Sequence, residues 1–162
     1  MPTITVEQSV TINRPADQVW RFLSDGNNTI KWQQNMHSHR IEENTQHTVR
    51  KVGGYRMETH GQTQNDHEGR IRSIQGQIDT NVGVHEYEVQ HTVTPVGDSA
   101  STVDTRAVWH ADQHSAEGAQ TMEKILNNAT EGDLMILKHL LEASPEVHQH
   151  LQQTHPVWEG SS

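Results

Sequence analysis

Apolar and polar residues alternate along the first part of the chain, where Ile4, Val6, Val10 and Ile12 fall on one face. A period of two is typical of a β-strand with one buried face. The same alternation predicts six further strands, at residues 35–43, 48–60, 65–75, 77–83, 85–96 and 100–111. Turns are predicted at Asn44-Thr45, Gly61-Gln62, Gly76 and Gly97-Asp98. Short strands joined by close turns indicate an antiparallel meander.

The pattern changes to a helical period in three places. Pro15 favours a first helical turn, and Val19, Phe22 and Leu23 share a face, which predicts a helix at residues 15–23. A second helical turn is predicted at residues 28–33. The longest apolar stripe predicts a helix over residues 116–143. We therefore expect one domain at residues 1–144, followed by a polar tail at 145–162.

Composition alone lies near the limit for disordered chains, because Leu, Ile, Val and Phe make up about 19% of the residues and the net charge is -9. The long alternation and the amphipathic helix favour a folded domain instead. The chain has no cysteine and no long apolar run, and its first residues lack a basic stretch followed by an apolar one. These features predict a cytoplasmic protein without a membrane span.

Charge and motifs exclude several function classes. With 21 acidic and 12 basic residues and no Lys/Arg cluster, we expect no nucleic-acid partner. Gly53-Gly54 is isolated and precedes a strand, so a phosphate-binding loop has no support. The nucleophile elbow of Gly-x-Ser-x-Gly hydrolases is also absent.

Five short motifs occur in order between about Val6 and Glu142: "VTINRPADQVWRFLSD", "IKWQQNM", "VGGYRM", "VQHTVTPVGDSASTVDT" and "GDLMILKHLLE". Together with the order of elements, they resemble the helix-grip fold of the START/SRPBCC superfamily, which includes polyketide cyclase/dehydratase-like proteins. It implies an α+β fold in which a seven-stranded antiparallel sheet wraps around the long C-terminal helix. Two short helices after the first strand would close one end of the sheet.

The resemblance also implies a ligand cavity between the sheet and the C-terminal helix, and a polar-lined cavity agrees with the low apolar content. Projecting the alternation inward gives a set of expected ligand-binding residues: Trp32, His37, Tyr55, Met57, His67, Ile71, His85, Tyr87, His91, Trp109, Met122 and Ile125. Aromatic, thioether, imidazole and phenol groups suit a flat, oxygenated small molecule. The resemblance suggests an aromatic or polyketide-like compound.

Three of these residues, His85, Tyr87 and His91, are candidates for acid–base catalysis of cyclisation or dehydration, because imidazole and phenol groups can move protons beside a carbonyl. The sequence leaves open whether the cavity is catalytic. A non-catalytic carrier, or a module that modulates a partner protein, is the alternative within the superfamily. We expect no cofactor, and either a monomer or a homodimer.

The main alternative from a different class of protein is a metal-dependent, cupin-like enzyme. In "HSHRIEE", a period of two places His37, His39 and Glu43 on one face of a strand, as in the first cupin motif. The glycine expected before that motif is absent, and Pro95-x-Gly97 is not followed by a histidine. The sequence therefore favours a site without a metal.

Overall fold

A computed structural model describes residues 3–80, 83–110 and 116–143. Its elements are, in chain order, β1 (Thr3–Ile12), α1 (Ala16–Leu23), the 3-10 turn η1 (Gly26–Asn28), α2 (Thr29–Trp32), β2 (Met36–Glu42), β3 (Thr45–Val52), β4 (Tyr55–Asp66), β5 (Ile71–Thr80), β6 (Gly83–Val96), β7 (Ala100–His110) and α3 (Ala116–Glu142). The predicted tail at 145–162 lies outside the described residues.

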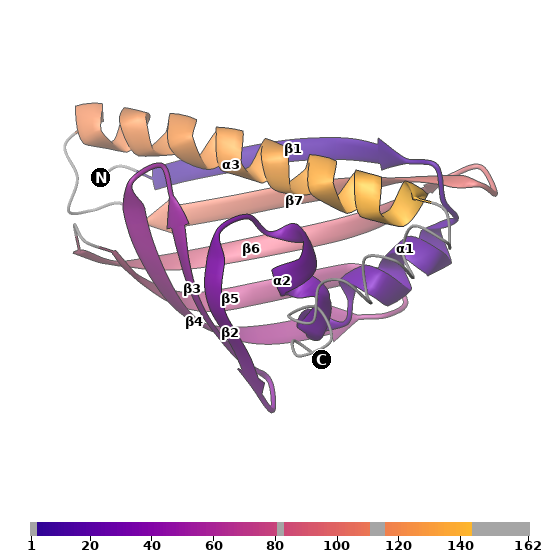
Figure 1. Cartoon of the computed structure of the whole chain (residues 1–162), viewed down its shortest axis with the longest axis horizontal. Coiled ribbons are helices and arrows are strands. Elements are labelled where there is room, and N and C mark those ends of the chain that lie inside the picture. Colours follow the sequence, from indigo (N-terminus) through magenta and orange to yellow (C-terminus); the bar gives the residue numbers. More distant parts are fainter. Residues whose placement is uncertain (1–2, 81–82, 111–115, 144–162) are drawn as a thin grey trace.

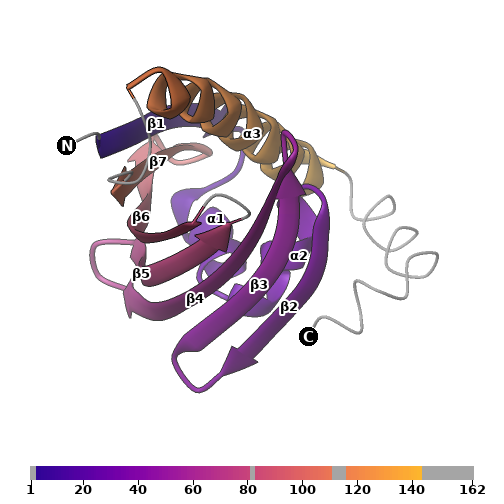
Figure 2. The ribbon, with the colours of Figure 1, turned by 90° about the vertical axis from the view of Figure 1, so that its left-hand side faces the viewer.

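The strands form one antiparallel sheet in the order β1-β7-β6-β5-β4-β3-β2. Helix α3 runs along β1, and α1 and α2 follow β1 in the chain (Figure 1). Seen from the end, the sheet is strongly curved, and the β3–β4 end turns back towards α3 (Figure 2). The predicted helix-grip architecture is confirmed.

Three of the predicted strands have wrong boundaries, although the described residues contain seven strands, as predicted. The single strand expected at 48–60 is a hairpin, because Gly53 and Gly54 form a two-residue turn with φ values of 53° and 89°. Such a turn requires positive φ at both central residues, which glycine adopts without strain. The strands expected at 65–75 and 77–83 are replaced by a turn at 67–70 and the single strand β5.

Gly61 and Gly76 do not form turns but lie opposite each other in the pairing of β4 with β5. A Cβ atom at Gly76 would collide with the backbone carbonyl of His60. A Cβ at Gly61 would collide with the Tyr87 hydroxyl and the Ile74 side chain. These glycines therefore allow close approach inside the sheet, which is the other common role of glycine in a strand.

The apolar side chains form two clusters along α3. One lies between the sheet and the N-terminal half of the helix and includes Met122 and Leu126. The other joins α1 and α2 to the C-terminal half of α3, including Leu134 and Leu137. Helix α1 contributes Ala16, Val19, Trp20 and Leu23 to this second cluster, at the spacing that gives a helix one apolar face. The aromatic residues near the N-terminus thus anchor the short helices to the sheet and α3.

Candidate functional site

A cavity of about 120 Å³ lies between the concave face of the sheet and α3. Its apolar lining is Val6, Trp32, Val52, Met57, Ile74, Ile78, Val89, Ala107, Trp109, Leu126 and Ala129. Drug-sized ligands occupy roughly 300–1,000 Å³, whereas an apolar cavity of about 150 Å³ is enough to bind benzene. The volume of this cavity is therefore on the scale of a single aromatic ring.

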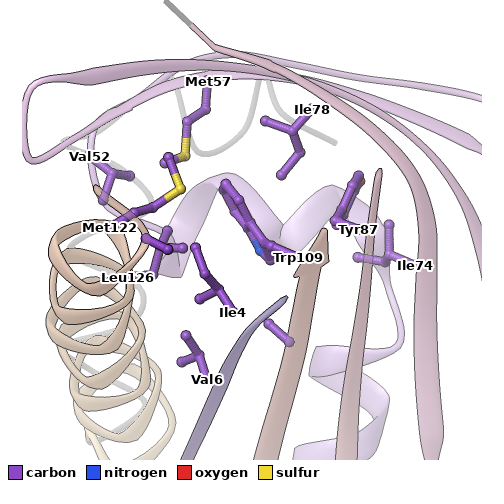
Figure 3. Packing of buried hydrophobic residues seen from close by; sticks show 12 residues of the cluster. Ile4, Val6, Val52, Met57, Ile74, Ile78, Tyr87, Trp109, Met122 and Leu126 are labelled. Atoms are coloured by element: carbon purple, nitrogen blue, oxygen red, sulfur yellow. The ribbon is translucent and has the colours of Figure 1, made fainter. Parts of the chain in front are cut away.

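Five of the predicted ligand-binding residues line the cavity: Trp32, Met57, Tyr87, His91 and Trp109. Tyr87 and His91 project from β6 on the same face, because both are odd-numbered positions of one strand. In Figure 3, Trp109 and Tyr87 lie on adjacent strands, and Met57 points from the sheet towards Met122 of α3.

Two predicted residues lie outside the cavity because the strand pattern breaks beside them. A register shift between Met36 and Ser38 interrupts the β2–β3 pairing, and the intervening His37 is exposed. Such a shift turns a side chain away from its expected face. His67 lies in the turn after β4, where its Nδ1 accepts a hydrogen bond of 3.2 Å from Trp20 Nε1.

The other five predicted residues do not line the cavity either: Tyr55, Ile71, His85, Met122 and Ile125. Tyr55 and Ile71 are the first residues of their strands and are only partly buried. His85 is buried, with its Nδ1 3.3 Å from the carbonyl oxygen of His110. The cavity is lined by residues one or more turns further along α3 than predicted. Met122 is buried in the first apolar cluster, and Ile125 packs against that cluster.

The other polar residues that line the cavity were not predicted from the sequence: Gln33, Gln46, Thr48, Arg50, Thr59, Thr105, Thr130 and Asp133. Four of these residues lie on β3 or β4, and one continuous strand was predicted at residues 48–60, where these two strands meet. The two-residue turn reverses the parity of the inward face, from even numbers on β3 to odd numbers on β4. Gly53-Gly54 between two alternating runs is a hairpin signal that could have identified them.

Tyr87 presents a neutral phenol to the cavity. Burial raises the pKa of Tyr87 to about 12, opposed by a hydrogen bond with the Thr59 side chain. The Thr59 hydroxyl in turn contacts the hydroxyl of Thr48 across the β3–β4 pair. Tyr87 therefore keeps its proton at neutral pH and can donate a hydrogen bond to an oxygen.

His91 is neutral as well, for a related reason. Burial, together with the nearby charge of Arg72, lowers the pKa of His91 to about 4. Its Nδ1 lies 2.8 Å from Thr105 Oγ1, and its ring packs edge-on against Trp32 with 5.5 Å between centroids. Both contacts hold the ring in place. Because of its lowered pKa, the imidazole is uncharged at pH 7.

Arg72 is a buried arginine close to Gln46 and His91. Arg72 donates from Nη2 to Gln46 Oε1 at 3.3 Å, and from Nη1 to Asn65 Oδ1 at 3.1 Å and the Ser24 carbonyl at 3.3 Å. All three partners are neutral, and none of the ion pairs among the described residues involves Arg72. Burial lowers the pKa of Arg72, but guanidinium still remains protonated. The negative charge of Asp25 lies close enough to oppose this lowering, so the Arg72 cation beside Gln46 and His91 has an acidic neighbour.

An ion pair closes the other side of the cavity. Arg50 Nη1 lies 3.1 Å from Asp133 Oδ2 and Arg50 Nη2 lies 3.3 Å from Oδ1, which joins β3 to α3. Burial raises the pKa of Asp133, and the Arg50 charge opposes that shift. The backbone N–H of Gln34 donates to Asp133 Oδ1 at 2.9 Å, and Arg50 Nη1 donates to Gln33 Oε1 at 3.2 Å.

The structure gives no support to the cupin-like alternative. His37 is exposed, and Glu43 lies in the β2–β3 turn with a φ of 54°. Across the described ranges, no group of three or more metal-ligating side chains is arranged to hold an ion. No helix in the described part of the chain is both long and apolar enough to cross a membrane.

A curved antiparallel sheet that grips the long helix α3, with a cavity of aromatic and polar residues between them, is the helix-grip fold. The family model described as "Polyketide cyclase / dehydrase and lipid transport" matches residues 3–142. The chain belongs to this family. A search of curated protein sequences found no match.

Solved structures share the fold at low sequence identity. The Zhui aromatase/cyclase from Streptomyces sp. R1128 aligns with a TM-score of 0.73 and 15% identity, covering 87% of this chain and 94% of that one. A START superfamily protein from Mycobacterium smegmatis gives 0.72 and 12%, covering 86% and 97%. The di-domain ARO/CYC BexL of the BE-7585A biosynthetic pathway gives 0.69 and 17%, with coverage of 83% of this chain and 45% of BexL.

Proposed function

We propose that the protein binds a small, oxygenated aromatic or polyketide-like molecule between the sheet and α3. The observation that carries the proposal is the combination of two indole rings, Trp32 and Trp109, with two neutral polar groups, Tyr87 and His91, around one cavity. Flat apolar surface together with a few placed donors and acceptors is typical of small-molecule sites. The family and the aromatase/cyclase neighbour support the same ligand class.

The same groups support cyclisation or dehydration chemistry. The phenol of Tyr87 can donate a hydrogen bond to a carbonyl oxygen and polarise it for attack. The neutral imidazole of His91 can accept a proton from a carbon beside another carbonyl. The two residues are two inward positions apart on β6, so they contact different atoms of one ligand. His85, the third catalytic candidate, does not line the cavity and has no part in this proposal.

One observation favours a non-catalytic carrier as the second candidate. A pKa near 4 makes His91 a weak base, because the proton it would accept is held poorly in the buried site. In a carrier, Tyr87 and His91 would orient the ligand without reacting. Turnover of a bound polyketide-like ketone separates the two functions, since a carrier would release it unchanged.

Native mass spectrometry of the protein as purified is the first test. We expect a co-purified compound with the mass and absorbance of an oxygenated aromatic molecule. Binding can then be measured calorimetrically with a defined probe, 1-phenyl-1,3-butanedione, which combines one ring with two carbonyl oxygens.

Tyr87→Phe should weaken binding of this diketone by about tenfold, because one hydrogen bond from a buried donor is lost while the ring remains. Tyr55→Phe is the matched control, since the Tyr55 side chain does not line the cavity. Equal affinities for the wild type and Tyr87→Phe would remove Tyr87 from the site. Failure of the wild type to bind the diketone would contradict the proposed ligand class.

A further inference from the structure

Two histidines lie directly opposite each other on the outer face of the sheet. His47 of β3 is paired in register with His60 of β4. Their chain neighbours Thr48 and Thr59 line the cavity, so the alternation of side chains along a strand turns both imidazoles to the convex face (Figure 2). The side chain of His60 is 50% exposed, and His47 is only partly buried. The pair is therefore accessible from solvent and separate from the cavity.

The two rings face each other through the same type of nitrogen atom. His47 Nδ1 lies 2.7 Å from His60 Nδ1, and the ring centroids are 4.7 Å apart. A neutral imidazole has one ring nitrogen with a free lone pair, which is a common metal ligand. Two imidazole nitrogens bound to one tetrahedral Zn²⁺ are about 3.3 Å apart, because each Zn–N bond is about 2.0–2.1 Å long. The two nitrogens would therefore separate by about 0.6 Å, which needs only small rotations of the two side chains.

A carboxylate lies beside the other ring nitrogen of His60. Glu58 Oε1 is 3.7 Å from His60 Nε2. Metal-binding histidines usually donate their second ring N–H to a carboxylate, a carbonyl or water, which fixes the tautomer that leaves the first nitrogen free to bind. A proton on Nε2, held towards Glu58, leaves Nδ1 of His60 free on the side of His47. This arrangement is an observation independent of the distance between the rings.

The charges around the pair are compatible with a bound cation. Arg40 of β2 lies opposite His47 in the strand pairing, and its Nε is 3.1 Å from Glu42 Oε1. Arg56 Nη1 is 3.3 Å from Glu58 Oε2. Both arginines therefore have a carboxylate partner, and the whole chain carries a net charge of -9, which attracts cations.

We propose that His47 and His60 bind one divalent transition-metal ion on the outer face of the sheet, through both Nδ1 atoms. Imidazole suits zinc, nickel and copper. Water completes the coordination, because the described residues provide no group of three ligating side chains. The ion replaces the contact between the two rings and cross-links β3 to β4. This inference is independent of the proposed function, which uses the opposite face of the sheet.

Isothermal titration of the full chain with Zn²⁺ tests the pair. The chain has 13 histidines, so the experiment compares variants and does not rely on the number of ions that the wild type binds. We expect His47→Gln and His60→Gln each to lose one equivalent of bound Zn²⁺. The double variant should lose no more than either single variant, because one ion needs both rings. His110→Gln, at an exposed position at the end of β7, is the matched control and should bind as the wild type does.

Glu58→Gln tests the supporting carboxylate. We expect this variant to bind the same number of ions as the wild type but to hold the ion at the pair about tenfold more weakly, as is usual when a partner of a metal-binding histidine is removed. Glu88→Gln, an exposed position on β6, makes the same change in net charge and is the control.

Two results would overturn the proposal. One is wild-type stoichiometry and affinity in both single histidine variants. The other is a loss of one equivalent in each single variant and of two in the double variant, because the two histidines would then bind separate ions. Equal weakening by Glu58→Gln and Glu88→Gln would reduce the part of Glu58 to its charge and contradict its contact with His60. None of these results bears on ligand binding in the cavity.

Discussion

His91 and Tyr87 illustrate how burial sets the chemistry of single residues in this protein. Neither has a charged partner at hydrogen-bond distance, and in both cases burial is the main cause of the pKa shift. Desolvation disfavours the charged form of any group, so it raises the pKa of a phenol and lowers that of an imidazole. Both side chains are therefore held neutral over the same broad range of pH.

This shift makes stability depend on pH. The unfolded chain binds a proton at His91 below its ordinary pKa of 6.5, whereas the folded chain does so only near pH 4. The folded state is therefore fully favoured above pH 6.5 and loses stability as the pH falls towards 4. The loss from His91 is up to about 3 kcal/mol, since each pKa unit corresponds to about 1.4 kcal/mol.

Urea unfolding at pH 7 and at pH 4.5 measures this effect. We expect the wild type to lose more free energy of unfolding between these pH values than His91→Gln, which has no imidazole to protonate. His37→Gln, at an exposed position, should behave as the wild type does. Parallel pH profiles for the wild type and His91→Gln would contradict the assignment. The burial that lowers the pKa of His39 adds an effect of the same sign to all three proteins.

At the scale of elements, β4 and β5 depend on two glycines that face each other. Gly61 lies below the Tyr87 hydroxyl, and Gly76 lies against the backbone of His60. Because Gly61 has no side chain, the Tyr87 hydroxyl can lie over β4. A side chain at either position would displace backbone or a cavity-lining group.

Gly76→Ala should destabilise the fold by about 1–3 kcal/mol, the usual range for overpacking, because its methyl group would meet backbone atoms that cannot rotate away. The exposed neighbour Gln75→Ala is the control and should change stability by less than about 0.5 kcal/mol. Thermal or urea unfolding measures both. A Gly76→Ala variant as stable as the wild type would show that the strands can separate locally.

The same elements show what could be predicted from the sequence. The strand at residues 3–12 and the helix at 116–143 were located within a residue or two, because their periodic patterns are long and uninterrupted. Gly53-Gly54 and Gly61 were misassigned because a glycine in a strand and a glycine in a turn look alike without knowledge of the neighbouring strand.

The misassigned glycines also limited how much of the candidate site could be predicted. Residues on β6 and β7, such as Tyr87 and Trp109, were found because their alternation continues without a break. The inward-facing residues of β3, which include Thr48 and Arg50, were not predicted because the hairpin at Gly53-Gly54 was not recognised. The pairing of Arg50 with Asp133 joins positions 83 residues apart, and no local pattern contains that information.

At the scale of the whole molecule, the chain is acidic and rich in histidine. It carries a net charge of -9 with its 13 histidines neutral, and its isoelectric point is about 5.7. Protonation of histidines between pH 7 and 5.5 therefore removes most of the net charge. Proteins near zero net charge lose the mutual repulsion that keeps them dispersed.

We expect a solubility minimum between about pH 5 and 6. Light scattering of concentrated protein at low ionic strength, followed from pH 8 to 4.5, measures it. Added salt should shift the curve less at the minimum than at pH 8, where charge repulsion is strongest. Scattering that rises steadily below pH 5, without recovery, would point to acid unfolding through His91 instead.

The place of α3 at the end of the described chain has a consequence for biosynthesis. All seven strands of the described residues precede this helix, which covers the concave face of the sheet and completes both apolar clusters. On the ribosome, the sheet is synthesised before its cover, so Trp109, Tyr87 and their neighbours face water or a chaperone until residues 116–142 emerge. Nascent chains that stall before this helix should therefore be the form of the protein most prone to aggregate.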